Sequence, residues 1–184
     1  MIVQRKVIRG TAGLLLLLPL VAMQFTDEVA WDVVDFGIFA ALLAGVCVVY
    51  EVLAGGRKSA AYRSAAGVAV GAAFALIWVT GAVGIIGAAD NNANFMFGGV
   101  LVVGVAGAIM ARFKPLGLSR AMFGTALAQV LVGAVALIAG FGSMDSSWPM
   151  EIWMSTVVFT ALWLVSASLF RKAAREECPA DGSR

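Results

Sequence analysis

The residues best suited to chemistry are four carboxylates that fall within nine positions of the stretch MQFTDEVAWDVVDF, at 23–36: Asp27, Glu28, Asp32 and Asp35. If 28–36 is helical, Glu28, Asp32 and Asp35 share one face, because each residue turns a helix by about 100°. Carboxylates this close repel one another unless a cation or a proton joins them. The row therefore predicts a cation or proton site, a docking rim for a cationic partner, or a solvated rim that helps to set topology.

A second polar group follows in GAADNNANF, at 87–95, where four side chains carry oxygen: Asp90, Asn91, Asn92 and Asn94. Asn and Asp accept hydrogen bonds from the exposed N–H groups at a helix start, so we expect Asn94 or Asn92 to cap the next helix. The same side chains could join the acids of 28–35 as ligands, since hard cations prefer oxygen. The sequence leaves the metal unspecified.

A third candidate lies inside an apolar stretch, where Gln129 follows Thr125 near the middle of 119–141. An amide at that depth usually bonds to a neighbouring helix, for about 1 kcal/mol or less. We expect Thr80 or Thr160 as its partner. A polar substrate pocket is the alternative.

Several kinds of catalytic machinery are missing from the sequence. The chain contains no histidine, which removes His-based triads and bases and most zinc or haem sites. It has no phosphate loop and no cysteine pair at metal spacing, since Cys47 and Cys178 are far apart. We therefore expect no enzymatic activity, no cofactor and no nucleic-acid partner; an enzyme acting on lipid would rest only on the paired carboxylates.

These polar groups must be positioned by membrane helices, because 61% of the 184 residues are hydrophobic and 13% are charged. Apolar stretches of about 20 residues are long enough to cross a bilayer. We expect one all-α membrane domain over 1–172, followed by a polar tail at 173–184. Its six spans, arranged as three hairpins, are 8–25, 32–54, 64–88, 95–112, 119–141 and 149–170. The first resembles a signal peptide, but no convincing cleavage site follows and we interpret it as a retained span.

The basic residues agree with six spans. All thirteen Lys and Arg residues would then lie on one side of the membrane, while the loops on the other side carry only acidic charges. The positive-inside rule makes the basic side cytoplasmic. We expect a multi-pass protein of the bacterial inner membrane with its N-terminus and C-terminus both in the cytoplasm.

Small residues predict where helices touch, since close backbone approach packs helices in lipid. Gly81, Gly84 and Gly87 extend a small-residue face along 64–88, and glycines also recur in 95–112 and 119–141. We expect these three spans to be central, and the Leu-, Phe- and Trp-rich spans, 149–170 among them, to be peripheral. An Arg followed four residues later by Gly opens each odd span, which raises the alternative of a triplicated hairpin.

Three motifs together resemble a widespread group of small uncharacterised bacterial multi-span membrane proteins: MQFTDEV-x-W…DF, VTGAVGIIGAADNNANFMFGGVL and SRAMFGTALAQVLV. The resemblance covers most of the chain, and the first motif is its most specific part. The group implies a proline where this chain has Ala93, and often Asn where it has Thr80. It supports the membrane class and implies no activity.

Two functions follow as hypotheses. The first is a non-enzymatic accessory or interaction subunit that binds other membrane proteins, or a second copy of itself, within the bilayer. The alternative is a small cation- or proton-coupled transporter or channel that uses Glu28, Asp32 and Asp35 with the 90–94 loop. Transport requires Asp35 to face the interior of the bundle, near Asp90 or Gln129.

Overall fold

The computed structural model describes residues 31–56, 59–144 and 147–177, together with positions 10, 13, 14, 16, 17, 19, 21 and 23–25. The elements with assigned bounds are all helical: α2 (Val33–Ala54), α3 (Ala60–Ala82), η1 (Asn92–Phe95), α4 (Met96–Met110), α5 (Pro115–Ile138) and α6 (Met150–Glu177). Within these residues, five helices are long and apolar enough to cross a membrane. The fold is thus all-α, as predicted. The predicted first span, 8–25, is described only in part and has no helix with assigned bounds.

The chain divides into two compact units, Met1–Val52 and Leu53–Arg184. In the first unit, the Trp31 ring packs edge-on against Phe36 and Phe39, with centroid separations of 5.2 and 5.3 Å. Edge-to-face pairs of this kind are favourable beyond the area that they bury. They fold the segment before α2 back onto the first turns of that helix.

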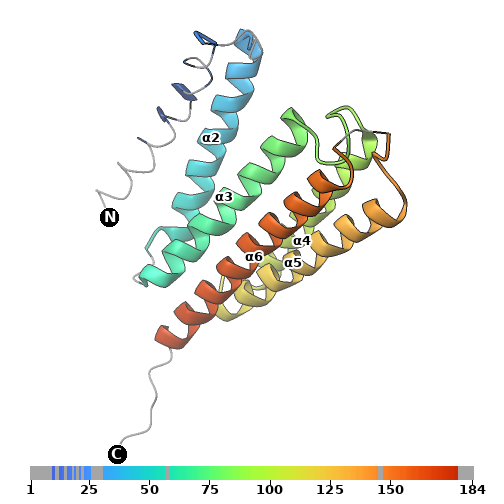
Figure 1. Cartoon of the computed structure of the whole chain (residues 1–184). Helices are drawn as coiled ribbons and strands as arrows, with labels where there is room; N and C mark the ends of the chain where they lie inside the picture. Colours follow the sequence, from blue (N-terminus) through green and yellow to red (C-terminus); the bar gives the residue numbers. More distant parts are fainter. Residues whose placement is uncertain are drawn as a thin grey trace, which may run out of the picture. The chain divides into compact units, whose positions relative to one another are not determined.

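The second unit is an antiparallel bundle of α3, α4, α5 and α6 (Figure 1). Helix α6 packs against both α3 and α5, and α5 packs in turn against α4, whereas α3 and α4 touch each other little. The expectation that 149–170 is peripheral is therefore wrong. Its aromatic residues do not all face outward, because Phe159, Trp163 and Phe170 are buried.

Side-chain hydroxyl groups connect the helices of the bundle. Ser166 on α6 donates to the carbonyl oxygen of Ala65 on α3 at 2.9 Å. On the other side of α6, Ser119 on α5 donates to the carbonyl oxygen of Ala167 at 2.8 Å. Tyr62, which is fully buried, donates to the carbonyl oxygen of Phe113 in the α4–α5 turn at 3.1 Å. The two serine bonds fix the register of α6 between α3 and α5, and the Tyr62 bond connects α3 to the α4–α5 turn.

Glycines bring α4 and α6 close to α5, as the small-residue pattern predicted. A Cβ added at Gly107 would lie 2.7 Å from Cβ of Ala121, and one added at Gly104 would lie 3.2 Å from Oγ1 of Thr125. A Cβ added at Gly133 would lie closer still to Oγ1 of Thr156 on α6. Because the contacts at Gly107 and Gly133 leave no room for a methyl group, the helix backbones approach closely there.

Other glycines end helices instead of packing them. Helix α3 ends at Ala82, six residues before the predicted end at 88, because Gly84 and Gly87 adopt φ of +85° and +64°. Left-handed backbone of this kind breaks a helix and favours glycine. A Cβ added at Gly142, in the α5–α6 connection, would lie 3.0 Å from the backbone nitrogen of Gly87. The two connections at this end therefore pack directly together.

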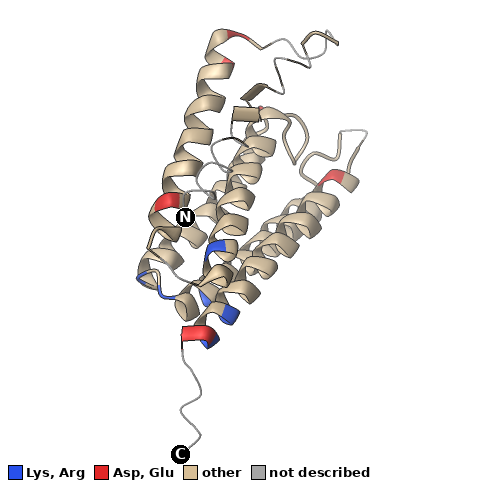
Figure 2. Cartoon of the chain, turned by 90° about the vertical axis from the view of Figure 1, so that its left-hand side faces the viewer, with Lys and Arg blue, Asp and Glu red and all other residues tan. Residues whose placement is uncertain are grey.

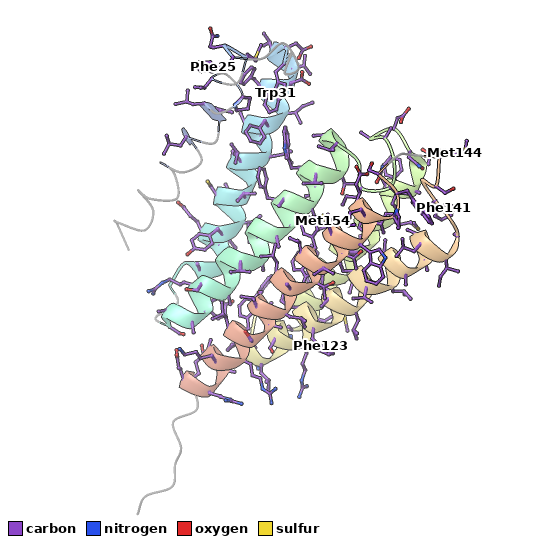
Figure 3. All side chains as sticks on the ribbon, in the orientation of Figure 1. Phe25, Trp31, Phe123, Phe141, Met144 and Met154 are labelled. Atoms are coloured by element: carbon purple, nitrogen blue, oxygen red, sulfur yellow. The ribbon has the colours of Figure 1, made fainter. Side chains whose placement is uncertain are left out.

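The outer surface of the bundle is apolar. Only 22–33% of the residues in the most apolar windows of α3 to α6 are buried within the protein. Large apolar side chains point outward, among them Phe123, Phe141, Met144 and Met154 (Figure 3). Such a surface is expected of helices whose solvent is lipid.

Charge is distributed unevenly along the bundle. Its Lys and Arg residues gather at the end where α3 begins and α6 ends, with Glu176 and Glu177 among them, whereas Glu151 lies at the opposite end (Figure 2). This distribution agrees with the predicted separation of basic and acidic loops for the described part of the chain. Which end is cytoplasmic stays a prediction.

The Gly107 contact gives a stability prediction. Gly107→Ala adds a methyl group that Ala121 cannot avoid by rotating its side chain, so α4 and α5 must separate, at a cost of about 1–3 kcal/mol. We expect a lower melting temperature for the full-length protein in detergent. Gly99→Ala on the same helix is the matched control, since an added Cβ there meets no atom within 4 Å. Equal melting temperatures for the two variants would show that the α4–α5 contact is looser than described.

Candidate functional site

Asp32 and Asp35 form a reciprocal cap at the start of α2. Oδ1 of Asp32 accepts from the backbone N–H groups of Val34 and Asp35, at 2.7 and 2.9 Å. Oδ2 of Asp35 accepts in return from the backbone N–H of Asp32, at 3.0 Å. The spacing is that of a capping box, in which the residue before the helix and its third residue satisfy exposed N–H groups for each other.

The cap changes the interpretation of the acidic row. Residues 31 and 32 are not helical and α2 begins at Val33, so the assumption of a helix over 28–36 fails at its centre. Both aspartates have oxygens engaged with backbone N–H groups. Asp27 and Glu28 lie outside the described residues, and the row of three carboxylates stays a prediction. In the described part of the chain, no three His, Cys, Asp or Glu residues group closely enough to hold a metal ion.

Asn94 organises the connection between α3 and α4. Its Oδ1 accepts from the backbone N–H groups of Ile85 and Ile86, at 3.0 and 2.9 Å, and its Nδ2 donates to the carbonyl oxygen of Ala88 at 3.0 Å. Asn94 is buried, with only 4% of its surface exposed. One amide therefore satisfies three backbone groups that the glycine turns remove from helical hydrogen bonding.

The cap of the following helix comes from a different residue than expected. Asn91 precedes η1 and its Oδ1 accepts from the backbone N–H of Ala93 at 3.0 Å. We expected Asn94 or Asn92 in that role; Asn94 instead folds back onto the loop before it. Asp90 and Asn92 are exposed. This loop and the acids of α2 belong to separate units. The cation site that the two would form together stays a prediction.

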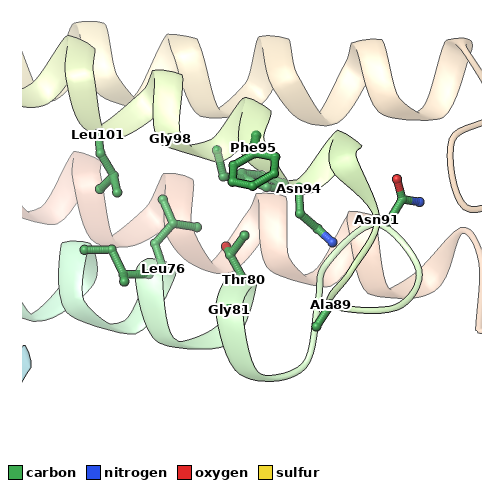
Figure 4. Close-up of a pocket in the computed structure, with 11 residues that line it drawn as sticks. Leu76, Thr80, Gly81, Ala89, Asn91, Asn94, Phe95, Gly98 and Leu101 are labelled. Atoms are coloured by element: carbon green, nitrogen blue, oxygen red, sulfur yellow. The ribbon is translucent and has the colours of Figure 1, made fainter. Parts of the chain in front are cut away.

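A pocket of about 290 Å³ opens between α3 and α4 beside this loop (Figure 4). Leu76 and Gly81 line it from α3, Gly98 and Leu101 line it from α4, and Phe95 lies between the two helices. Thr80 is the polar group of the α3 wall. Its Oγ1 is buried and has no hydrogen-bond partner among the described residues. The pocket is thus a mostly apolar groove with one unused hydroxyl group.

A second set of polar atoms is buried along the contact between α5 and α6. Gln129 is fully buried, and neither its amide oxygen nor its amide nitrogen has a hydrogen-bond partner among the described residues. The same holds for Oγ1 of Thr156, Oγ1 of Thr160 and Nε1 of Trp163 on α6. Because Gly133 rests against Thr156, Gln129 and Thr160 each lie one turn further along the same contact.

These positions only partly match the expectations for Gln129. We predicted a hydrogen bond to Thr80 or Thr160, and neither bond forms. Thr125 instead donates to the carbonyl oxygen of Ala121 in its own helix, at 2.9 Å. Sequence reasoning did not include Thr156 and Trp163 in this set. The signal was present, since 156, 160 and 163 follow the spacing of one helix face.

No family model, curated protein or solved structure matches the chain. The resemblance carried by 23–36 therefore stays an expectation.

The role of Asn94 leads to a second prediction. Asn94→Leu keeps the approximate volume but leaves the N–H groups of Ile85 and Ile86 buried and unpaired, at about 1–3 kcal/mol for each group. We expect a lower melting temperature and faster hydrogen exchange at these two amides. Asn92→Leu, at an exposed position in the same loop, should leave both measurements near those of the parent. Unchanged exchange in Asn94→Leu would mean that the glycine turns hold the loop without it.

Proposed function

We propose that this chain is a six-span protein of the bacterial inner membrane, with both termini in the cytoplasm, that acts as a non-enzymatic accessory or interaction subunit. The five long apolar helices, together with the leucine-rich stretch at 8–25, supply six spans. The basic end of the bundle supports the cytoplasmic assignment through the positive-inside rule.

The observation that carries the interaction role is the groove between α3 and α4. Helices in lipid associate through close packing at small residues and through hydrogen bonds between helices. This groove offers both, since Gly81 and Gly98 line it and the Thr80 hydroxyl, buried beside them, has no hydrogen-bond partner in the described part of the chain. A transmembrane helix from another membrane protein, carrying a polar side chain opposite Thr80, fits that combination.

The surface beside the groove extends the same features. Gly98 and Gly99 are exposed on α4, and a Cβ added at either would meet no atom within 4 Å. Phe95, at the start of this surface, is 81% exposed. An approaching helix would meet small residues along α4 and an aromatic anchor at its end.

The buried polar side chains of the described bundle support a role without catalysis. Apart from Tyr62 near the start of α3, they carry no ionisable group: Asn94, Thr125, Gln129 and Ser166. General acid–base chemistry and proton coupling both use groups that gain or lose a proton within the protein. The titratable side chains of the described bundle lie toward its ends or on its surface.

One observation favours the transport hypothesis as a second candidate. The unpartnered amide and hydroxyl groups of Gln129, Thr156 and Thr160 lie together on the α5–α6 contact. Polar groups inside a membrane domain frequently mark the path of a substrate or an ion.

The groove hypothesis predicts the behaviour of one variant in particular. Gly98→Leu fills the groove, so we expect about tenfold less of any stoichiometric partner when the tagged protein is purified from its native membrane in mild detergent. Gly71→Leu on α3 is the control, because Gly71 is exposed, an added Cβ there meets no atom within 4 Å, and the residue does not line the pocket. Recovery of the same partner in the same amount with Gly98→Leu would exclude this groove as the docking surface.

Substitutions at Asp32 separate a structural from an electrostatic role. Asp32→Ser keeps a capping oxygen and removes the charge, whereas Asp32→Ala removes both and should cost about 0.5–2 kcal/mol of helix stability. If the accessory role holds, Asp32→Ser should retain the stability of the parent protein. Proteoliposomes that carry the parent protein should then show no more cation flux than empty vesicles. A flux that the parent supports and Asp32→Ser abolishes would favour transport instead.

A further inference from the structure

A second groove, of about 520 Å³, runs between α5 and α6 at the basic end of the bundle. Arg120 and Leu116 line it from α5, and Arg171 and Ser168 line it from α6. The hydrogen bond from Ser119 to the carbonyl oxygen of Ala167, at 2.8 Å, holds the two helices together at its floor. Because Arg120 follows Ser119 directly and Arg171 lies one turn beyond Ala167, the two guanidinium groups flank one site.

The charge of this groove is entirely positive. None of its lining residues is acidic, and no salt bridge joins Arg120 or Arg171 to a carboxylate in the described part of the chain. The nearby Glu176 is engaged elsewhere, since it accepts from the Ser59 hydroxyl at the start of α3 at 2.7 Å. Two adjacent cations without a counter-charge attract an anion, and guanidinium groups match the oxygens of a phosphate in bidentate geometry.

The rest of the groove is apolar and faces outward. Phe123 and Leu164 are 54% and 41% exposed, and Phe123 lies on the outside of the bundle (Figure 3). Leu164 precedes Arg171 by seven residues, which places it about 10 Å further along the helix at 1.5 Å per residue. An occupant with a negative head beside the arginines would therefore lay an apolar tail along Phe123 and Leu164.

We infer that this groove binds an anionic phospholipid from the leaflet at the basic end of the bundle. The phosphate group lies between Arg120 and Arg171, and one acyl chain follows Phe123 and Leu164. Basic pockets between transmembrane helices suit acidic lipid headgroups, because the arginines would otherwise hold their charge at the edge of the hydrocarbon. The site lies on different helices from the α3–α4 groove and does not depend on a protein partner there.

Native mass spectrometry of the full-length protein in mild detergent tests this inference. After incubation with phosphatidylglycerol, or with phosphatidylcholine of the same chains, we expect the parent protein to retain phosphatidylglycerol preferentially. The double variant Arg120→Gln/Arg171→Gln should retain it about tenfold less, as expected for losing charge-assisted hydrogen bonds. Arg112→Gln/Lys172→Gln removes the same charge from the same end but outside the groove, and should retain the lipid like the parent.

The other outcomes are equally decisive. Equal retention by the two double variants would overturn the site, because it would show general attraction to the basic end. Binding of inorganic phosphate in place of lipid, with the same dependence on Arg120 and Arg171, would overturn the lipid assignment in favour of a free anion. Phe123→Ala/Leu164→Ala separates these cases, since it should weaken lipid retention alone. If the Gln variant fails to fold, Arg120→Lys/Arg171→Lys takes its place. This variant keeps the charge but not the bidentate geometry, so it should retain measurably less lipid than the parent.

Discussion

The fold of the bundle depends on how α6 is held between α3 and α5. In lipid, apolar side chains gain little by leaving the hydrocarbon for a protein interior, so helices need close backbone contact and hydrogen bonds to stay together. Helix α6 has both on each side, with Ser166 bonded to Ala65 of α3 and Ala167 bonded to Ser119 of α5. Its buried aromatic residues fill the space that the small residues leave.

Polar side chains at several helix ends serve the backbone. Asp32 and Asp35 cap α2, Asn91 caps η1, and Asn94 satisfies three backbone groups in the loop that glycine turns create. Each exposed N–H or carbonyl group near hydrocarbon costs free energy unless a partner is close. The acidic residues at the start of α2 and the amide-rich loop before α4 are therefore explained by their hydrogen bonds to backbone groups at helix ends.

Other polar groups of the described residues have no such backbone role, and some of these define the candidate functions. Thr80 lies in the α3–α4 groove, Gln129 lies on the α5–α6 contact, and Arg120 and Arg171 flank the groove at the basic end. Thr80 suits a helix partner, and Arg120 and Arg171 suit an acidic lipid. Both grooves lie on the outer surface of the bundle, where a protein embedded in lipid meets other molecules of the membrane.

Sequence alone determined the features that depend on composition and short-range order. The 61% hydrophobic content and the ~20-residue apolar runs predicted apolar helices, and the spacing of small residues predicted that α4 and α5 approach closely. The sequence placed Asp32 and Asp35 in a predicted row of three carboxylates with Glu28, and the three-residue spacing of the two aspartates is also that of a capping box. The end of α3 could not be predicted in this way. Gly84 and Gly87 fit a helix face by their spacing, and they break the helix only because their backbone is left-handed.

Only the tertiary structure decided which helices are neighbours and which polar groups have partners. The aromatic residues of α6 suit lipid or a core equally well, so their burial could not be predicted from residue types. Arg120 and Arg171 are 51 positions apart in sequence, and each alone is an ordinary cation at a helix end. Their common groove exists because Ser119 and Ala167 set the register of α5 against α6, and that register is a property of the packed bundle.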